Sequence, residues 1–326
     1  MMFKKSIKNW MGLFAITLFV SCNSHSNSNV PVIGFADAFQ DNTIEQAKTG
    51  FLDALRNEGF DENKGTLKII YRNAQGNIPT LTQIIKYFIS QQVTLIGTNP
   101  SLSTITAVQN TKDIPIFMMV SPTPALMKVN DAQNNPPLNL FGVGETLDYI
   151  DTSFLLIPKV IKPKSGKLRV GMIFNQSEPQ SVESMERIRK LADGNNIDLL
   201  VQPVNSTADV QLVTASLLSK NPDVFFANPD NIVFESFETI IQSCNQKNIP
   251  IFTSEAGLVE RGALAAYGAD IYQWGYQAGR EAAQYLKTKS TAGLHWEMVI
   301  VRKKVFNPSA AKKFGIIIPS NFQPVQ

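Results

Sequence analysis

The chain has 326 residues, of which 44% are hydrophobic and 17% are charged. This composition supplies enough apolar material for about two ordinary domains and excludes an intrinsically disordered protein. Lysine and arginine exceed aspartate and glutamate by 30 to 27, but Lys4, Lys5 and Lys8 lie in a segment that we expect to be removed, so 3 minus 3 leaves no net charge. Because nucleic-acid binding needs lysine and arginine clustered along one face, we expect no nucleic-acid partner.

The N-terminal segment predicts the compartment. Three lysines precede the apolar stretch from Trp10 to Val20, which is about 11 residues long and too short to span a bilayer. The sequence Phe19-Val20-Ser21-Cys22 resembles a bacterial lipobox, whose cysteine is lipidated; the alternative is an ordinary secretory signal that contains a cysteine by chance. We expect residues 1–21 to be a lipoprotein signal peptide, Cys22 the lipidation site and residues 22–29 a polar tether. The mature protein is then expected in the cell envelope, extracytoplasmic and anchored to a membrane by lipid.

The first half alternates short apolar runs with amphipathic helical patterns, which is typical of a parallel sheet covered by helices. Thr43 and Gln46 have the spacing of a capping box, which predicts a helix that begins there and ends at Gly59. The strands expected in this half cover residues 30–35, 67–71, 93–97 and 115–120, with further helices from Pro79 and over 101–112.

The second half repeats this pattern from Arg169 onward. The expected strands cover residues 170–174, 199–204, 223–227 and 249–253, and the expected helices cover 181–192, 209–219 and 232–247. Cys244 falls on the apolar stripe of the last of these helices, so we expect a buried small side chain rather than a reactive thiol. The halves also echo each other, since residues 112–117 and 247–252 are similar and each follows an Asn-Pro pair.

The repeated architecture predicts an α/β fold with two doubly wound parallel-sheet lobes joined by a hinge. We expect the first lobe to contain residues 30–143 and about 269–291, and the second lobe 144–268 and about 292–326. Small residues at 142–144 and 265–269 suit chain crossings, although they also suit plain strand ends. Ligands bind at the carboxyl ends of open parallel sheets, so the cleft between the lobes is the expected site.

The sequence lacks the usual signatures of catalysis and of cofactor binding. Only two histidines occur, His25 and His295, so a histidine-dependent hydrolase or a metal centre is not expected. There is no phosphate loop, and Gly142 and Gly144 lack the third glycine of a dinucleotide fingerprint, so we expect no cofactor. A hydrolase using cleft carboxylates stays open as an alternative, with Glu178, Asp230, Glu255 and Asp270 as its acids.

Seven segments together resemble the ABC-transporter substrate-binding family that includes tryptophan- and tyrosine-binding lipoproteins. The segments are residues 73–77, 111–115, 175–181, 229–231, 254–255, 262–268 and 314–319, read in this order. The resemblance covers nearly the whole mature chain and implies a type I periplasmic-binding-protein fold, no enzymatic activity, and an ABC permease with its ATPase as partners. The chain departs from the family after the first strand, where residues 36–41 lack a His-Pro pair, at Ser121-Pro122, where an Asp-Pro pair is usual, and at Gln180, where asparagine is usual.

The candidate ligand-binding residues follow the strands of both lobes. In the first lobe they are Phe39, Gln40, Thr98, Asn99, Ser101 and Ser121, and in the second lobe Asn175, Glu178, Ser181, Asp230, Asn231, Ser254, Glu255 and Tyr267. Thr98, Asn99 and Ser101 offer hydroxyl and amide groups that either bind polar atoms or only cap a helix. Phe39 and Tyr267 either flank the ligand or belong to the core.

The sharpest hypothesis concerns the two ends of an amino-acid ligand. Asp230 would pair with the ammonium group, supported by Asn231, unless the two only form a turn or cap. Ser181 would start a helix whose free N–H groups hold the carboxylate, unless it only caps that helix. None of the three tryptophans falls in a predicted binding loop.

We therefore expect a monomeric binding protein for an aromatic or branched amino acid, with a sugar or nucleoside as the alternative ligand. A ligand sensor coupled to a membrane signalling partner is the alternative function. The sequence does not distinguish transport from sensing, nor does it identify the ligand.

Overall fold

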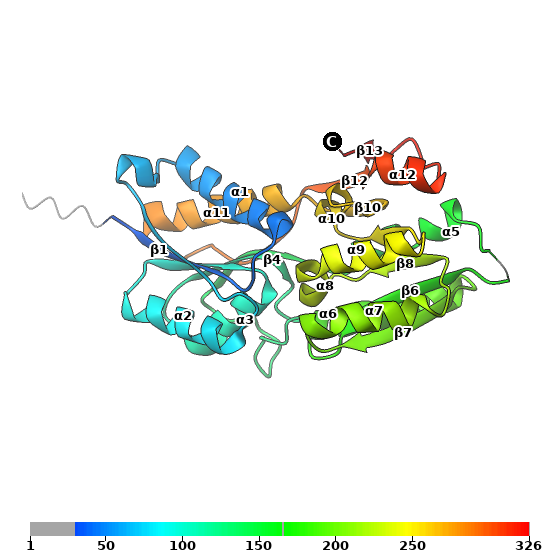
Figure 1. The fold of residues 1–326 in the computed structure, drawn as a ribbon. Coiled ribbons are helices and arrows are strands. Elements are labelled where there is room, and N and C mark those ends of the chain that lie inside the picture. The colour runs from blue at the N-terminus through cyan, green and yellow to red at the C-terminus, as the bar shows by residue number, and fades with distance from the viewer. Residues whose placement is uncertain (1–29, 165, 326) are drawn as a thin grey trace, which may run out of the picture.

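A computed structural model describes residues 30–164 and 166–325. The expected signal peptide, Cys22 and the tether lie outside these residues. The described chain forms two α/β lobes, each built on its own sheet, side by side along the molecule (Figure 1). The predicted fold class is confirmed, because each sheet is predominantly parallel and carries helices on both faces.

The first sheet is wholly parallel and has the strand order β11-β5-β4-β3-β1-β2. Its central strands are buried on both faces, which explains their nearly continuous apolar sequences. The strands are β1 (Val32–Asp37), β2 (Lys68–Asn73), β3 (Leu95–Asn99), β4 (Ile116–Pro122), β5 (Leu140–Glu145) and β11 (Glu297–Met298).

Two pairs of helices cover this sheet, with α1 and α11 on one face and α2 and α3 on the other (Figure 1). Glycines let α1 and α11 approach closely, since a Cβ atom at Gly275 would lie 1.8 Å from the carbonyl oxygen of Ala47. The capping residue of α1 is Asp41, whose carboxylate accepts hydrogen bonds from the N–H groups of Thr43 and Ile44, so the predicted capping box at Thr43 is wrong. The helices are α1 (Asn42–Asn57), η1 (Glu62–Lys64), α2 (Ile78–Ser90), α3 (Ser101–Asn110) and α11 (Ile271–Thr288).

The second sheet has the order β13-β12-β10-β9-β8-β6-β7 and is parallel except where β12 runs antiparallel to β10. The strands are β6 (Arg169–Asn175), β7 (Asp198–Val204), β8 (Val224–Ala227), β9 (Ile251–Thr253), β10 (Ala265–Ala269), β12 (Arg302–Phe306) and β13 (Gln323–Pro324). The helices are α4 (Tyr149–Phe154), α5 (Ile157–Val160), α6 (Pro179–Gly194), η2 (Thr207–Asp209), α7 (Val210–Leu218), α8 (Asn231–Glu235), α9 (Phe237–Gln246), α10 (Ala256–Glu260) and α12 (Pro308–Phe314).

Two expectations for the second half need correction. The single helix expected over 232–247 is two helices, α8 and α9, which meet at Ser236. The segment after α11 first returns to the first sheet, where β11 pairs with β5, so residues 297–298 do not belong to the second sheet. Cys244 is fully buried on α9, as its apolar stripe predicted.

The described chain crosses between the two lobes at three places, from β5 to α4, from β10 to α11 and from β11 to β12. These crossings lie beside one another, since β5 pairs with β11 and β10 pairs with β12. Within the described residues, no helix is both long and apolar enough to cross a membrane.

Candidate functional site

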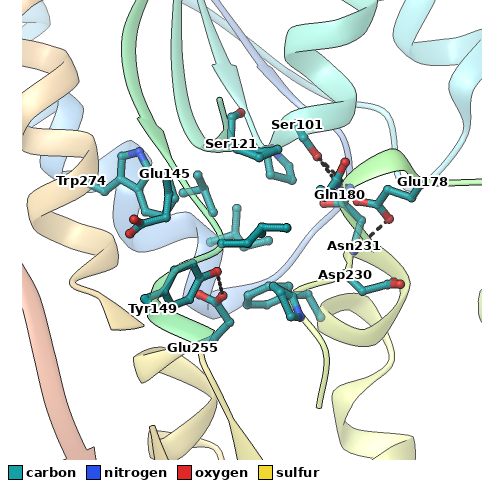
Figure 2. Close-up of a pocket in the computed structure, with 17 residues that line it drawn as sticks. Ser101, Ser121, Glu145, Tyr149, Glu178, Gln180, Asp230, Asn231, Glu255 and Trp274 are labelled. Atoms are coloured by element: carbon teal, nitrogen blue, oxygen red, sulfur yellow. Dashed lines mark hydrogen bonds between the residues drawn. The ribbon is translucent and has the colours of Figure 1, made fainter. Parts of the chain in front are cut away.

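A pocket lies between the two lobes, where about 470 Å³ of space, part of it open to solvent, contains no protein atom. The first lobe lines it with the ends of β4 and β5 and with the start of α3, and the second lobe lines it with the starts of α6 and α8 (Figure 2). Strand ends and helix starts of both lobes therefore meet in one cleft, where ligands bind in open α/β folds. This pocket is the best candidate for a ligand site.

One end of the pocket, beside the crossings, carries two glutamates and two aromatic residues (Figure 2). The Tyr149 hydroxyl donates a hydrogen bond of 2.6 Å to Oε1 of Glu255, and the Glu145 carboxylate forms an ion pair with Arg302 through its own Oε1. Burial raises the pKa of each carboxyl to about 7, against the opposing effects of Arg302 on Glu145 and of Tyr149 on Glu255. Near neutral pH, the carboxyls of Glu145 and Glu255 are therefore each partly protonated and partly ionised.

The opposite end of the pocket is a cluster of amides, a hydroxyl and a carboxyl (Figure 2). Gln180 and Asn231 each donate a hydrogen bond to Oγ of Ser101, at 2.9 and 3.0 Å, and both also donate to the carboxyl of Glu178. Burial and the nearby Asp230 carboxylate raise the pKa of Glu178 well above its usual range. Since Ser101 belongs to the first lobe and the two amides to the second, this cluster joins the lobes.

Apolar side chains line the wall between the two ends, and they are Ile44, Pro100, Val120, Pro122, Leu147, Pro229 and Phe234. Among the described residues that line the pocket, none is a lysine, arginine or histidine. The same part of the chain has no group of three or more histidine, cysteine or acidic residues placed to hold a metal ion. The pocket thus combines an apolar middle with acidic and amide ends.

The carboxylate of Asp230 is fully engaged by the protein itself. Its Oδ1 accepts the N–H groups of Ile232 and Val233, as the cap of α8, at 2.8 and 3.1 Å. Its Oδ2 accepts the N–H of Asn175 at 2.7 Å and the hydroxyl of Ser181. Two donors to each oxygen use the whole hydrogen-bonding capacity of a carboxylate. Asp230 lies in the pocket wall, as expected, but it caps a helix and has no lone pair left for an ammonium group.

Ser181 does not start a helix, because α6 begins at Pro179 with Glu178 as its capping residue. The Ser181 side chain is fully buried, and its Oγ also accepts hydrogen bonds from the N–H of Asn175 and the side-chain amide of Asn228. The predicted capping role of Ser181 is therefore wrong. Helix α6 starts at the pocket without a side-chain cap, and so does α3, whose capping residue is Pro100 and whose first residue, Ser101, lines the pocket.

The other expected residues divide between the pocket and its surroundings. Ser101, Ser121, Glu178, Asp230, Asn231 and Glu255 line the pocket. The residues that do not line it are Phe39, which is in the core, Gln40, which is exposed, and Thr98, Asn99, Asn175, Ser254 and Tyr267, which lie around it. Ser254 still reaches the site indirectly, because its hydroxyl donates to Glu255 at 3.5 Å.

Several residues that line the pocket were missed by the sequence analysis, above all Trp274, Tyr149 and Glu145. Trp274 belongs to α11, and its indole N–H donates a hydrogen bond of 2.8 Å to the carbonyl of Val143. These residues lie at two of the three crossings, from β5 to α4 and from β10 to α11, where segments distant in sequence converge. No local motif marks such convergence, although the small residues at 142–144 indicated one crossing.

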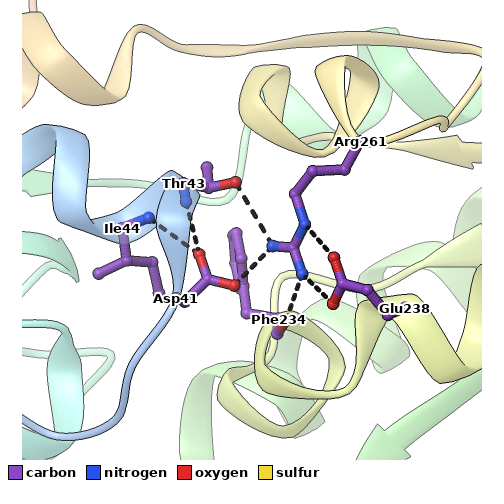
Figure 3. A network of polar contacts seen from close by, with 6 residues as sticks. All are labelled: Asp41, Thr43, Ile44, Phe234, Glu238 and Arg261. Atoms are coloured by element: carbon purple, nitrogen blue, oxygen red, sulfur yellow. Dashed lines mark hydrogen bonds and ion pairs between the residues drawn. The ribbon is translucent and has the colours of Figure 1, made fainter.

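A second contact between the lobes is centred on Arg261 (Figure 3). Its guanidinium pairs with Asp41 of the first lobe at 2.5 Å and with Glu238 of the second lobe at 2.7 Å, and it donates to the carbonyl of Phe234 at 3.2 Å. The Asp41 side chain is only 2% exposed. Because Phe234 also lines the pocket, Arg261 links the pocket wall to Asp41 of the first lobe.

The family follows from a comparison with known proteins. A model described as ABC transporter substrate binding protein matches residues 32–323. The chain belongs to this family. Its members are solute-binding proteins rather than enzymes, as the sequence analysis expected. A tyrosine-binding protein of Clostridioides difficile strain R20291 is 29% identical to this substrate-binding protein over 295 residues, which are 87% of this chain and 84% of that protein.

Solved structures show the same fold. A conserved domain protein from Vibrio cholerae has a TM-score of 0.80 at 26% identity, covering 91% of this chain and 100% of that one. An ABC domain from Streptococcus pneumonia in complex with L-Trp has a TM-score of 0.79 at 22% identity, covering 90% and 99%. The ligand-free, open structure of a substrate-binding protein from Clostridium difficile scores 0.65 at 26% identity, covering 91% and 99%. In this chain the lobes are in direct contact across the cleft, through Ser101 with Gln180 and Asn231 and through Asp41 with Arg261.

Proposed function

We propose that this substrate-binding protein takes up an aromatic amino acid in the pocket between its lobes. The observation that carries the proposal is the pocket itself, whose apolar wall, which includes Phe234, separates two polar ends, one of which also carries Trp274 and Tyr149. An aromatic amino acid matches this pattern, because its ammonium and carboxylate groups point in different directions from one carbon atom and its ring is a large apolar surface. The tyrosine-binding relative and the L-Trp complex support the same ligand class.

The start of α3 is the proposed place for the ligand's carboxylate. Helix N-termini attract anions through unpaired N–H groups and the helix dipole. Helix α3 has ten residues and no side-chain cap, and Pro100 and Ser101 at its start both line the pocket. A carboxylate there lies beside the amides of Gln180 and Asn231 from the second lobe, so the ligand draws the lobes together.

The protein is further proposed to be a lipoprotein that delivers its ligand to an ABC permease and its ATPase. The supports are the lipobox-like sequence that ends at Cys22, the polar run after it and the family of the chain. A lipid anchor at Cys22 with a seven-residue tether, residues 23–29, keeps the protein at the outer face of a membrane. The location is therefore the cell envelope.

Ligand binding is tested with protein that begins at residue 30. A thermal-shift screen of L-tyrosine, L-tryptophan, other amino acids, sugars and nucleosides is followed by calorimetry. A ligand at a hundredfold excess over its Kd stabilises the fold by about 2.7 kcal/mol. We expect this response from tyrosine or tryptophan. A response from sugars or nucleosides alone would contradict the proposed ligand class.

Anchoring and delivery are tested in cells. Replacing Cys22 with serine is expected to release the protein from the membrane while ligand affinity stays unchanged, because the tether separates the anchor from the fold. Uptake of the labelled ligand should fall in the strain that carries only this variant. Unchanged uptake in a strain that lacks the protein entirely would favour a sensor over a transport protein.

A further inference from the structure

The four carboxyl groups that line the pocket differ in their remaining capacity for hydrogen bonds. Those of Asp230 and Glu178 each accept four hydrogen bonds from the protein. Glu145 is 2% exposed, and its Oε2 has no partner although it is buried. Glu255 receives its two hydrogen bonds, from Tyr149 and Ser254, on Oε1, so its Oε2 has none among the described residues. Among the described residues that line the pocket, carboxylate oxygens without a donor therefore occur only at the end beside the crossings, whereas the one unpartnered acceptor at the opposite end, Oε1 of Gln180, belongs to a neutral amide.

We propose that Glu145 and Glu255, with Tyr149, form the subsite for the ligand's ammonium group, in place of Asp230. This inference rests on the proposed function, since it assigns one end of the amino-acid ligand. An ammonium group has three N–H donors, which suit two carboxylate oxygens and a neighbouring hydroxyl. A buried acceptor without a donor is costly, so the ligand that supplies the donor gains that free energy on binding.

The charges at this end support the assignment. The charge of Glu145 is compensated by Arg302, whereas no lysine, arginine or histidine lines the pocket beside Glu255. With both carboxyls ionised, the cluster has one uncompensated negative charge, which one ammonium group neutralises. A carboxylate ligand group would meet repulsion here, and this end of the pocket therefore orients the amino acid with its carboxylate towards α3.

The same groups predict a coupling between binding and pH. Glu145 faces Arg302, Glu255, Asp148 and Tyr149, and Glu255 faces Tyr149, Ser254 and Glu145. In the empty pocket both carboxyls have a pKa of about 7, so a large fraction is protonated at neutral pH. An ammonium group binds their ionised form. Binding therefore releases protons, and affinity rises as the pH increases from about 5.5 to about 7.5.

The main test compares ligand analogues by calorimetry on wild-type protein and on Glu255→Gln. The probes are L-tryptophan and L-tyrosine, their analogues without the amino group, indole-3-propionate and 3-(4-hydroxyphenyl)propionate, and the amines tryptamine and tyramine. We expect the wild type to prefer each amino acid over its desamino analogue by at least a hundredfold. In Glu255→Gln, affinity for the amino acid should fall at least tenfold, while affinity for the desamino analogue stays within threefold.

A matched control and a second subsite variant separate the subsite from general effects of removing a buried acid. Glu281 is a buried glutamate outside the pocket whose pKa is raised to about 8 by burial, so Glu281→Gln should leave the amino preference unchanged. Glu145→Gln should reduce it, as Glu255→Gln does. If a variant does not fold, the proton count decides, because calorimetry of the wild type in buffers of different ionisation enthalpy should show proton release near pH 7.

The possible failures are distinguishable. If amino acids bind but Glu255→Gln and Glu145→Gln keep the full amino preference, or if binding releases no proton, the subsite assignment is wrong and the proposed function stands. If the amines bind and the amino acids do not, the subsite stands and the amino-acid ligand is wrong. If neither amino acids nor amines bind, both proposals are overturned.

Discussion

The two lobes present the same short pattern at the cleft, Asn99-Pro100-Ser101 in the first and Asn228-Pro229-Asp230 in the second. The asparagine of each pattern is fully buried and fixes the loop through its side-chain amide. The patterns differ after the proline, because Asp230 caps its helix completely whereas α3 starts at Ser101 without a side-chain cap. Loops of similar sequence therefore differ in role. The loop of the second lobe caps its own helix, whereas the loop of the first lobe leaves the N–H groups at the start of α3 free to hold a ligand.

The largest expected effect comes from removing the cap in the second lobe. Asp230→Ala leaves four donors without their acceptor, two at the start of α8 and one each on Asn175 and Ser181. Because unpaired buried groups cost about 1 to 3 kcal/mol each, less what water recovers, we expect the free energy of unfolding to fall by about 3 kcal/mol or more. Urea denaturation measures it. A loss under about 1 kcal/mol would contradict the capping role.

A second variant gives the loop at Ser101 the aspartate that the second lobe has at the corresponding position, Asp230. Ser101→Asp places a carboxylate at the open start of α3, where it competes with the ligand's own carboxylate. We expect ligand affinity to fall at least tenfold, or about 1.4 kcal/mol, in calorimetry. Ser101→Ala is the control, since it removes the same hydroxyl without adding charge, and its effect should be several times smaller. Equal effects of both variants would show that the charge at this position is irrelevant.

The two asparagines give a matched pair with a smaller effect. The Asn228 side chain donates to Ser181 and accepts from Ser184 at 2.5 Å, so both of its polar atoms are bonded. The Asn99 side chain donates to Asp37 and to the carbonyl of Ile44, but its amide oxygen, Oδ1, is buried without a partner. Asn228→Ala should therefore destabilise the protein by about 1 kcal/mol more than Asn99→Ala does. If urea denaturation showed a larger loss of stability in Asn99→Ala than in Asn228→Ala, this prediction would be contradicted.

The smallest effect is expected at the contact between the lobes outside both loops. Arg261→Met removes the ion pair with Asp41, which joins the second lobe to the first. We expect ligand affinity to fall roughly threefold, or about 0.7 kcal/mol, since both charges regain water in the open state. Small-angle scattering of the ligand-free variant should show a larger radius of gyration than the wild type. An unchanged affinity would show that the pair does not contribute to closure and that the contacts at the pocket alone hold the lobes together.

The sequence was sufficient for strands β1 to β4 and β6 to β9 and for the helices between them, because buried parallel strands have apolar runs and the helices that cover them have regular stripes. It did not predict the long helix α11. It was less informative at strand ends. Strand β1 continues to Asp37, a polar residue that remains buried because it accepts a hydrogen bond from Asn99 on the neighbouring strand. The break at Ser236 also gave no signal, since the apolar stripe of Val233, Phe237 and Ile240 continues through it.

The site was predictable only where it depends on local order along the chain. Ser101, Asn231 and Glu255 follow strands, so the rule for parallel sheets placed them at the cleft. Trp274 lies within the first turn of a long helix and Tyr149 starts a helix after a crossing, and their position depends on how the crossings bring distant segments together. The hydrogen bonds that occupy Asp230 also come from residues distant in sequence, and they decide its role.

The three crossings between the lobes restrict how the lobes can move. Ion pairs tie them to one another, Arg302 with Glu145 and Lys303 with Asp270 at 2.6 Å. Twisting one lobe about the long axis, or sliding it past the other, would stretch at least one of three linked connections. Bending about them is the motion that remains. Closure then follows a single coordinate, and a ligand that is too long for the pocket stops the lobes short of full closure without disturbing their alignment.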